Sequence, residues 1–295
     1  MSAPASVRES ESLRLRRAEL SDVAECGRIC YEAFTSLNRH HNFPPDFPNV
    51  ETANDVLNWM FSHDKFHCVV AELNGKPVGS NCLDERSEIA GVGPITVDPA
   101  VQNKSVGRRL MLAAMERAAQ QKAVGIRLVQ VAFHNRSLSL YTKLGFDPKE
   151  PLSVMNGLAI RRTPPGYAVR AATNEDVEAC DALCRRVHGH ERRAELQDGI
   201  AVGTARVAEF DGRITAYASA MGFFGHAVAE NNRDLQALIS TAEQILGSGI
   251  LVPTRNASLF RWCLEQGLRI IEPATLMSIG LYNEPAGAFL PSITF

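Results

Sequence analysis

The sequence predicts an α/β fold in which a mixed sheet is covered by helices and which occurs as two tandem copies. Three observations support this prediction. The two halves of the 295-residue chain share an internal repeat. In the first half, Asn74-Gly75 lies between apolar runs, which is a strong hairpin signal. Further strands then alternate with amphipathic helices, as they do in mixed sheets covered by helices.

The repeat consists of matches that occur in the same order in both halves. The offset, which is the difference in residue number between matched positions, falls along the chain from 154 (170 − 16) to 122 (272 − 150). The second copy is therefore shorter than the first. Between the hairpin turn and the long helix the first copy spans 35 residues (110 − 75) and the second spans 23 (235 − 212), so twelve residues are missing there. The matched segments are 16–26 with 170–180, 70–76 with 207–213, 135–138 with 256–259, and 150–155 with 272–277.

Periodicity and turn signals predict the elements of each copy. The long helix, for example, has apolar Leu110, Ala114 and Ala118 at helical spacing. In chain order, the first copy is expected to contain a strand over 13–17, a helix from about residue 21, strands over 68–73, 77–84 and 89–97, a helix over 106–122, a strand over 126–132, a helix over 137–144 and a final hairpin.

The expected domain boundaries follow from the repeat. Residues 1–12 have no apolar run and are expected to form a disordered tail rather than a signal peptide. The two domains are expected over 13–160 and 167–284. The segment 161–166 is expected to link them, because consecutive prolines end helices and sheet ladders. The apolar segment 285–295 is expected to dock on the first domain, to contact a second copy in a homodimer, or to form a final strand of the second domain.

Composition argues against several classes of function. The chain has 31 Lys and Arg against 33 Asp and Glu, which gives no electrostatic case for binding nucleic acid or an anionic membrane surface. No apolar run approaches the roughly 18 residues of a membrane span. The seven cysteines include no C-x-x-C pair and lack partners at zinc spacing. We therefore expect reduced, mostly buried thiols, no metal and a cytoplasmic location.

The segment before the long helix has the most distinctive chemistry. Pro99 stops the preceding strand, and small residues then lead into the helix. Unpaired amides and the positive end of the helix dipole meet at such a point, which suits a pyrophosphate. Lys104, Arg108 and Arg109 add positive charge there, with the wrong sign for the dipole, which favours a bound anion. The alternative is a plain turn with solvated basic side chains.

Two motifs in the first copy resemble those of a known family. Gln102-x-x-Ser105-x-Gly107 resembles the Q/R-x-x-G-x-G/A motif of the GNAT acetyltransferases. Asn135 and the segment 140–146 (LYTKLGF) are similar to the family's N…LYxKLGF signature. The resemblance covers about residues 13–158 and reaches the second copy only through the repeat. It implies two tandem acyl-CoA N-acyltransferase-like domains, the second of which is degenerate.

The resemblance also implies acetyl-CoA as the acyl donor and assigns residues to it. Amides of the loop would hold the pyrophosphate, the strand end would pair with the pantetheine arm and polarise the thioester carbonyl, and Asn135 would steady the cofactor. Tyr141 would protonate the departing thiolate as a general acid. The implied cofactor-binding residues are Ile95, Thr96, Val97, Gln102, Asn103, Lys104, Ser105, Val106, Gly107, Arg108 and Asn135.

Two features depart from the family pattern. Ser105 replaces the first glycine of the motif, but it keeps a backbone N–H and has little bulk. The strands that carry a glutamate in many members read Gly93–Thr96 and Leu128–Val131 here and contain no carboxylate. The base that would deprotonate the acceptor is therefore unassigned. The alternatives are a water relay or one of the carboxylates Glu32, Asp84 and Glu85, each of which is otherwise a solvated surface group.

The sequence thus predicts a cytoplasmic N-acetyltransferase that moves acetyl directly to a small-molecule or peptide amine, with no nucleic acid, membrane or metal partner. Because Trp262 stands in the second copy where the first has Tyr141, we expect one acetyl-CoA per chain. The segment 38–48 is expected either to wall the acceptor site or to be a surface loop. Transfer of a longer acyl group is a further option. The missing base leaves a different class open, a non-catalytic acetyl-CoA-binding regulatory or interaction module.

Overall fold

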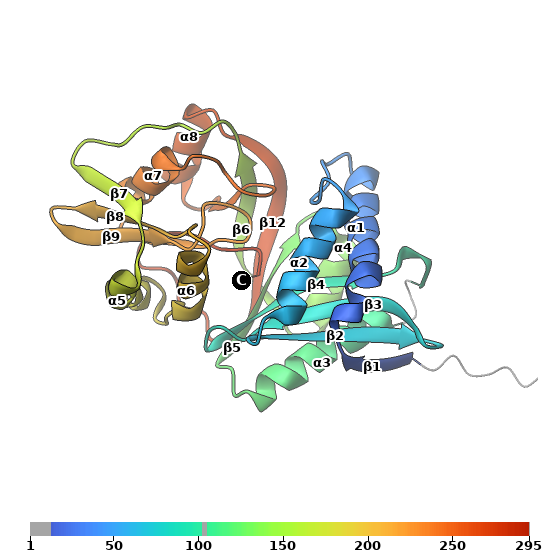
Figure 1. The fold of residues 1–295 in the computed structure, drawn as a ribbon. Helices are drawn as coiled ribbons and strands as arrows, with labels where there is room; N and C mark the ends of the chain where they lie inside the picture. The colour runs from blue at the N-terminus through green and yellow to red at the C-terminus, as the bar shows by residue number, and fades with distance from the viewer. Residues whose placement is uncertain (1–12, 102–104, 295) are drawn as a thin grey trace, which may run out of the picture.

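The computed structural model describes residues 13–101 and 105–294. Figure 1 shows two lobes side by side, the first in blue to green and the second in yellow to red. The first sheet has eight strands in the order β1-β2-β3-β4-β5-β12-β6-β11, and the second has five in the order β13-β10-β9-β8-β7. Since one strand pair of the first sheet is parallel and the others are antiparallel, the sheet is mixed. The predicted α/β fold is confirmed.

Most predicted elements of the first half are present, with ends that differ by a few residues. β1 and β4 have the predicted bounds, whereas α2 falls outside the prediction. The first half contains β1 (Leu13–Arg17), α1 (Val23–His40), α2 (Val50–Ser62), β2 (Phe66–Leu73), β3 (Lys76–Asp84), β4 (Ile89–Val97), α3 (Val106–Gln120), β5 (Gly125–Val131), α4 (Asn135–Lys143) and β6 (Asp147–Asn156). The second half contains β7 (Tyr167–Ala171), α5 (Val177–His188), α6 (Arg193–Ala201), β8 (Arg206–Phe210), β9 (Arg213–Ala218), β10 (Ala227–Ala229), α7 (Asn232–Thr241), β11 (Ile250–Pro253), α8 (Ala257–Glu265), β12 (Arg269–Gly280) and β13 (Ala288–Leu290).

The two halves exchange their last long strands. The predicted final hairpin of the first copy is wrong, because β6 does not pair with a following strand of its own half. Instead β12 lies between β5 and β6 and is antiparallel to both, while β6 pairs with β11. Figure 1 shows β6 and β12 side by side between the lobes. The second half therefore supplies β12 as the neighbour of β5, and the first half supplies β6 as the neighbour of β11, the counterpart of β5.

The register shows that this exchange is symmetric. Ala274 of β12 pairs with Val131 of β5, and Leu152 of β6 pairs with Pro253 of β11. The two pairs are related by the repeat offset of 122 (274 − 152 and 253 − 131). The domain ranges 13–160 and 167–284 and the linker 161–166 stay predictions, but the exchange means that the two ranges do not form separate sheets.

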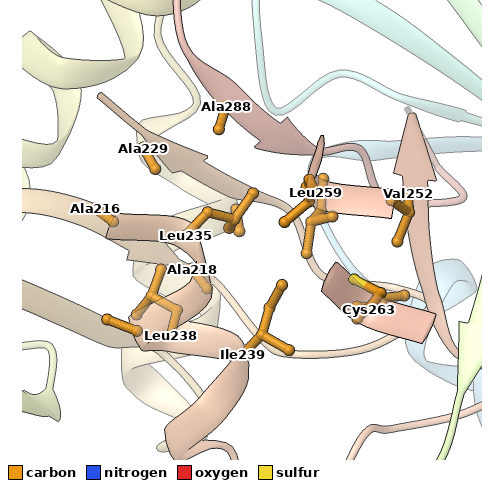
Figure 2. Close-up of a cluster of buried hydrophobic side chains, with 14 of the residues drawn as sticks. Ala216, Ala218, Ala229, Leu235, Leu238, Ile239, Val252, Leu259, Cys263 and Ala288 are labelled. Carbon is orange, nitrogen blue, oxygen red and sulfur yellow. The ribbon is translucent and has the colours of Figure 1, made fainter. Parts of the chain in front are cut away.

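The hydrophobic cores follow the exchange. The second-half core gathers between the strands and α7 and α8, with Leu235, Leu238 and Leu259 at its centre (Figure 2). Met155 of β6 is fully buried in this second-half core, whereas Met277 of β12 is fully buried in a core of the first half. Since apolar burial is the main favourable term in folding, each half depends on the other for part of its core.

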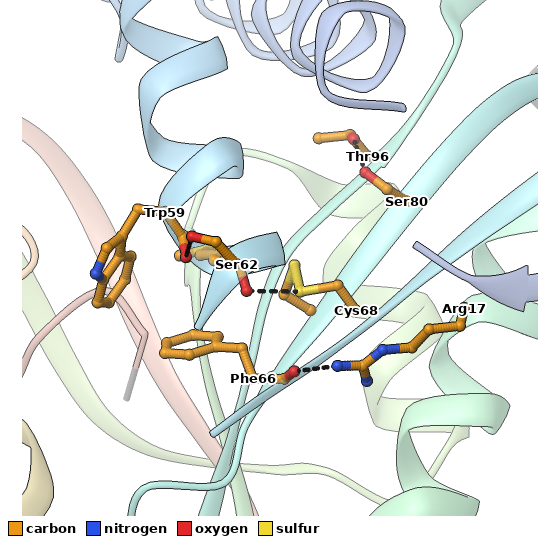
Figure 3. Close-up of a disulfide and its surroundings, with 9 residues drawn as sticks. Arg17, Trp59, Ser62, Phe66, Cys68, Ser80 and Thr96 are labelled. Carbon is orange, nitrogen blue, oxygen red and sulfur yellow. Dashed lines mark hydrogen bonds between the residues drawn. A yellow bond between two sulfur atoms is a disulfide. The ribbon is translucent and has the colours of Figure 1, made fainter. Parts of the chain in front are cut away.

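Two of the seven cysteines do not match the expectation of reduced thiols. Cys68 of β2 and Cys82 of β3 face each other across the strands and form a disulfide (Figure 3). Directly opposed positions on antiparallel strands bring Cβ atoms close together, and a sequence separation of 14 hides that proximity. Cys26, Cys30 and the three remaining cysteines are buried free thiols.

The segment after β12 contacts both halves. β13 pairs with β10 as the last strand of the second sheet. Beyond it, Thr294 is buried against Gly91 of β4, where an added Cβ would lie 1.8 Å from the Thr294 carbonyl oxygen. The segment thus combines two of the placements considered for 285–295, while the homodimer contact stays a prediction. Among the described residues, no helix is both long enough and apolar enough to cross a membrane.

Candidate functional site

A cavity of about 1000 Å³ opens where β4 and β5 separate. The two strands are parallel partners only from the pair of Ile89 and Gly125 to the pair of Gly91 and Arg127. Beyond that point they diverge, and residues 92–97 and 128–131 line the cavity. The edge of β4 that faces β5 therefore presents backbone groups to the cavity instead of to a neighbouring strand. The predicted residues Ile95, Thr96 and Val97 lie on this stretch.

The start of α3 faces the same cavity, which is lined by the predicted residues Ser105, Val106, Gly107 and Arg108. Ser105 adopts a left-handed conformation (φ 62°, ψ 12°), and its side chain accepts no capping hydrogen bond. The first amides of α3 are thus left without that cap and suit an anion. Three further predicted residues, Gln102, Asn103 and Lys104, lie outside the described residues.

The corresponding region of the second half is built differently. The side chain of Asn231 accepts hydrogen bonds from the amides of Arg233 and Asp234 and so caps the first turn of α7. β13 pairs with β10 on the edge that does not face β9. Within the described part of the second half, the helix start is capped and the strand edge is paired. In the first half, by contrast, Ser105 does not cap α3, and among the described residues the edge of β4 that faces β5 is not paired beyond Gly91.

Tyr141 lines the cavity from α4, with only 6% of its surface exposed. Burial raises the pKa of its phenol, and a hydrogen bond with Ser137 partly opposes this effect. The Ser137 hydroxyl lies 2.7 Å from Nδ1 of His134, and burial lowers the pKa of that imidazole. Tyr141 therefore keeps its proton at neutral pH, as a general acid must. Asn135, on the first turn of the same helix, also lines the cavity.

Sequence reasoning did not single out His134 and Ser137, although a signal is present. Positions 134, 137 and 141 follow the three- and four-residue spacing that places side chains on one helix face. It also did not single out Gln130, a buried residue that lines the cavity although neither side-chain amide atom has a partner among the described residues. An unpaired buried amide costs about 1–3 kcal/mol, so Gln130 indicates a place where a polar ligand group would fit. At the repeat offset the second half has Val252 (130 + 122).

The three carboxylates considered as bases lie elsewhere. None of them lines the cavity, and each pairs with an arginine: Glu32 with Arg28, Asp84 with Arg86, and Glu85 with Arg117. Among the described residues, the carboxylate that does line the cavity is Asp46, which sequence reasoning did not consider as a base. It belongs to the segment 38–48.

The cavity wall includes residues from both halves. From the segment 38–48, His40, His41 and Phe47 line it together with Asp46. Phe43 of the same segment stacks on Phe133, with ring centroids 4.2 Å apart and planes 12° apart. Stacking of this kind fixes the segment against the loop after β5. The second half contributes to the lining as well, with Phe223, Phe224, Ile293 and Thr294.

Comparison with known proteins gives these features a context. The family model for the acetyltransferase (GNAT) family matches residues 32–146. An uncharacterised N-acetyltransferase of Methanocaldococcus jannaschii is 26% identical over 146 residues, which cover 46% of this chain and 61% of that relative. The chain thus matches about three fifths of the length of this curated relative.

Two solved structures share the fold over nearly the whole chain. A Pyrococcus horikoshii protein named an acetyltransferase superposes with a TM-score of 0.74 at 18% identity and covers 97% of both chains. A tandem GNAT protein from the clavulanic acid biosynthesis pathway superposes with a TM-score of 0.57 at 14% identity, covering 91% of this chain and 98% of its own. At these identities the likeness concerns the fold alone. Residues 32–146 thus match the acetyltransferase (GNAT) family, and the fold of the whole chain is that of the two solved structures.

Proposed function

We propose that the protein is an N-acetyltransferase that moves the acetyl group of acetyl-CoA directly to an amine. The observation that supports this best is the meeting of three features in one cavity: the start of α3, which the Ser105 side chain does not cap, the edge of β4 that has no strand partner among the described residues beyond Gly91, and the protonated phenol of Tyr141. An anion site, a strand edge and an acid are the parts that such a transfer needs for its donor.

Each feature has a distinct role in this proposal. The amides of residues 105–108, with Gln102, Asn103 and Lys104, bind the pyrophosphate of the donor. Ile95, Thr96 and Val97 on the β4 edge pair with its pantetheine arm, and amides there stabilise negative charge on the thioester oxygen. Asn135 steadies the donor, and Tyr141 protonates the departing thiolate.

The second half has a structural role in this proposal and binds no acetyl-CoA. In the second half, Asn231 caps the helix amides and β13 pairs with the free edge of β10. The corresponding amides of α3 and edge of β4 are the backbone groups that the first half offers to the donor. The sequence match of Trp262 to Tyr141 is wrong: α4 and α8 are related by the offset of 122, so Cys263 stands where the first half has Tyr141, and it has no phenolic proton either. We therefore expect a stoichiometry of one acetyl-CoA per chain.

Titration calorimetry with acetyl-CoA and a thiol-release assay with a panel of amines test the proposal. The panel should contain diamines, amino acids, aminoglycosides and peptides with free N-termini. Arg108→Ala is expected to weaken acetyl-CoA binding about tenfold, since a hydrogen bond to a charged group contributes about 1.5–3 kcal/mol.

The matched control is Arg233→Ala, which changes an exposed arginine in the first turn of the corresponding helix α7. It is expected to leave binding unchanged. No binding of acetyl-CoA by the unaltered protein would overturn the proposal. Binding at one site without thiol release for any amine would instead favour a non-catalytic acetyl-CoA-binding module.

A further inference from the structure

Two carboxyl groups from opposite ends of the chain meet at the cavity wall. Asp46, half-buried, lines the cavity from the segment between α1 and α2. Its carboxyl group contacts that of Glu272 on β12, which is 1% exposed. Apart from this carboxyl contact, neither Glu272 oxygen has a partner among the described residues. The strand exchange therefore places a second-half carboxyl behind a first-half carboxyl.

The pair is unusual because it has no cation. Of the eight buried carboxyl side chains in the described residues, six pair with an arginine and Asp234 accepts a hydrogen bond from Tyr167. Glu272 is the exception. Neither it nor Asp46 forms a salt bridge within the described part of the chain. Two buried carboxylates without a counter-charge are costly, so such a pair keeps a proton, and its remaining negative charge suits a cation from outside the chain.

The repeat offers an internal comparison. Glu272 is the counterpart of Glu150 at the offset of 122, and both are buried on exchanged strands. Glu150 is neutralised by Arg255, whose nitrogen lies 2.6 Å from the carboxylate. At the same offset the first half has Phe133, which lines the cavity (255 − 122). Glu150 therefore lies beside the second half, which lacks the donor features, and Arg255 neutralises it there. Glu272 lies beside the first half, which has those features, and faces Asp46 instead of an arginine.

We propose that Asp46 and Glu272 form the acceptor subsite of the transferase: Asp46 binds the ammonium group of a cationic primary amine and takes its proton, and Glu272 positions Asp46. This inference rests on the proposed function. It supplies the base that the strands 93–96 and 128–131 lack, and it makes the second half part of the acceptor site.

The charge of the pair fits one ammonium group. Burial raises the pKa of Asp46 to about 6, and burial together with the Asp46 charge raises the pKa of Glu272 to about 8. Between these values the pair holds one proton and one negative charge. Asn38 and Cys30 of α1 also face Asp46, and His40 and His41 line the same cavity.

The proton and electron balance of the step is complete. Asp46 takes one proton from R–NH3⁺, and the lone pair of the resulting amine forms the C–N bond to the acetyl carbon. The C–S bond breaks with its electrons going to sulfur, and Tyr141 gives that sulfur its proton. The second proton lost by nitrogen restores Tyr141 through solvent, and Asp46 releases its proton to solvent. The products are the acetamide, coenzyme A thiol and one H⁺.

Asp46→Asn tests the base directly. With an amine that the unaltered protein acetylates, kcat/KM is expected to fall at least about 100-fold, the usual scale of general base catalysis. The dissociation constant of acetyl-CoA, measured by calorimetry, should change less than about twofold. The matched control Glu85→Gln alters a carboxylate that pairs with Arg117 outside the cavity, and its turnover should stay unchanged. Unchanged turnover of Asp46→Asn would overturn the inference.

Glu272 is a positioning residue, so its test needs a pH profile. Glu272→Gln keeps a donor for Asp46 and should retain activity at pH 7 within about tenfold, but the higher of the two titration steps should disappear from the profile of kcat/KM. Glu272→Ala should lose more activity at pH 7 than Glu272→Gln. If the unaltered protein, Glu272→Gln and Glu272→Ala all showed the same two titration steps in kcat/KM, Glu272 would not position Asp46. Thermal unfolding of each variant identifies loss of folding.

A binding experiment separates this inference from the proposed function. If the unaltered protein acetylates no amine, calorimetry with propylamine and with propanol still tests the subsite. We expect heat from propylamine only, at least tenfold weaker binding in Asp46→Asn, and normal binding in Glu85→Gln. Equal binding of propylamine by Asp46→Asn, or no binding by the unaltered protein, would overturn the inference. The proposed function fails separately, by absence of acetyl-CoA binding.

Discussion

Burial disfavours the charged form of the Tyr141 side chain and raises the pKa of its phenol, so the phenol stays protonated well above neutral pH. The hydrogen bond with Ser137 works in the opposite direction, and Ser137 is in turn held by His134. At the residue scale, the site is thus made of a few buried polar groups, each of whose protonation state is set by its immediate neighbours.

Tyr141→Phe removes the hydroxyl and leaves the ring in place. We expect turnover to fall by about 10²- to 10⁴-fold, the range of general acid catalysis, while acetyl-CoA binding stays within twofold. Thiol release and calorimetry measure the two quantities. Trp262→Phe, which changes an aromatic residue of the corresponding helix α8, should affect neither. Full turnover by the Tyr141 variant would show that another group protonates the thiolate.

Glu272 also makes stability depend on pH. Its pKa is raised from 4.5 in the unfolded chain to about 8 in the folded protein, so the folded state binds more protons between these values. By linkage the free energy of unfolding then falls as the pH rises from about 4.5 to 8. Glu272→Gln should flatten that decline in urea unfolding curves recorded across this range. An unchanged slope would contradict the raised pKa.

At the element scale, α3 combines two unusual residues at its start. Ser105 has a left-handed backbone, which L-residues adopt at a cost of about 1–2 kcal/mol. Gly107 lines the cavity, and among the described residues beyond its own helix backbone an added Cβ would meet nothing closer than 3.7 Å. Packing among the described residues therefore does not require a glycine at this position, whereas the proposed pyrophosphate site does.

Gly107→Ala separates these two explanations. Alanine favours a helix over glycine by up to about 1 kcal/mol, so the melting temperature should rise or stay unchanged. Acetyl-CoA affinity should nevertheless fall, because the methyl group enters the space where the pyrophosphate approaches the amides. Differential scanning fluorimetry and calorimetry measure the two effects. Unaltered affinity would mean that no ligand approaches this helix start.

The elements differ in how far the sequence could predict them. Strand β4, the start of α3 and the cavity residues on both follow from local signals, such as the arrest of a strand at Pro99. The exchange of β6 and β12 could not be predicted, because a hairpin and an exchanged pair need the same alternation of side chains. The contact of Asp46 with Glu272 depends on that exchange and joins residues 226 positions apart (272 − 46). No local pattern contains it.

At the scale of the whole molecule, the two halves share strands and hydrophobic cores. β12 supplies a strand and Met277 to the first half, and β6 supplies a strand and Met155 to the second. In residues 1–160 alone, the edge of β5 that faces β12 would be unpaired, and so would both edges of β6. Exposed strand edges of this kind favour aggregation.

Separate expression of 1–160 and 161–295 tests this dependence. We expect each fragment alone to aggregate or to lack a cooperative thermal transition. Coexpression should give a soluble one-to-one complex, seen by size-exclusion chromatography, that binds one acetyl-CoA. A monomeric, cooperatively melting fragment 1–160 with normal acetyl-CoA affinity would show that the exchanged strand is dispensable for the first half.

The exchanged strands also affect how such a chain can change over generations. A crossover between related genes at codons 161–166 would join a β6 from one parent to a β11 and β12 from the other. The residue pairs between β6 and β11, β6 and β12, and β5 and β12 would then combine residues from different parents, and so would the contact of Asp46 with Glu272. The two copies are therefore expected to be inherited together, despite their origin as a repeat.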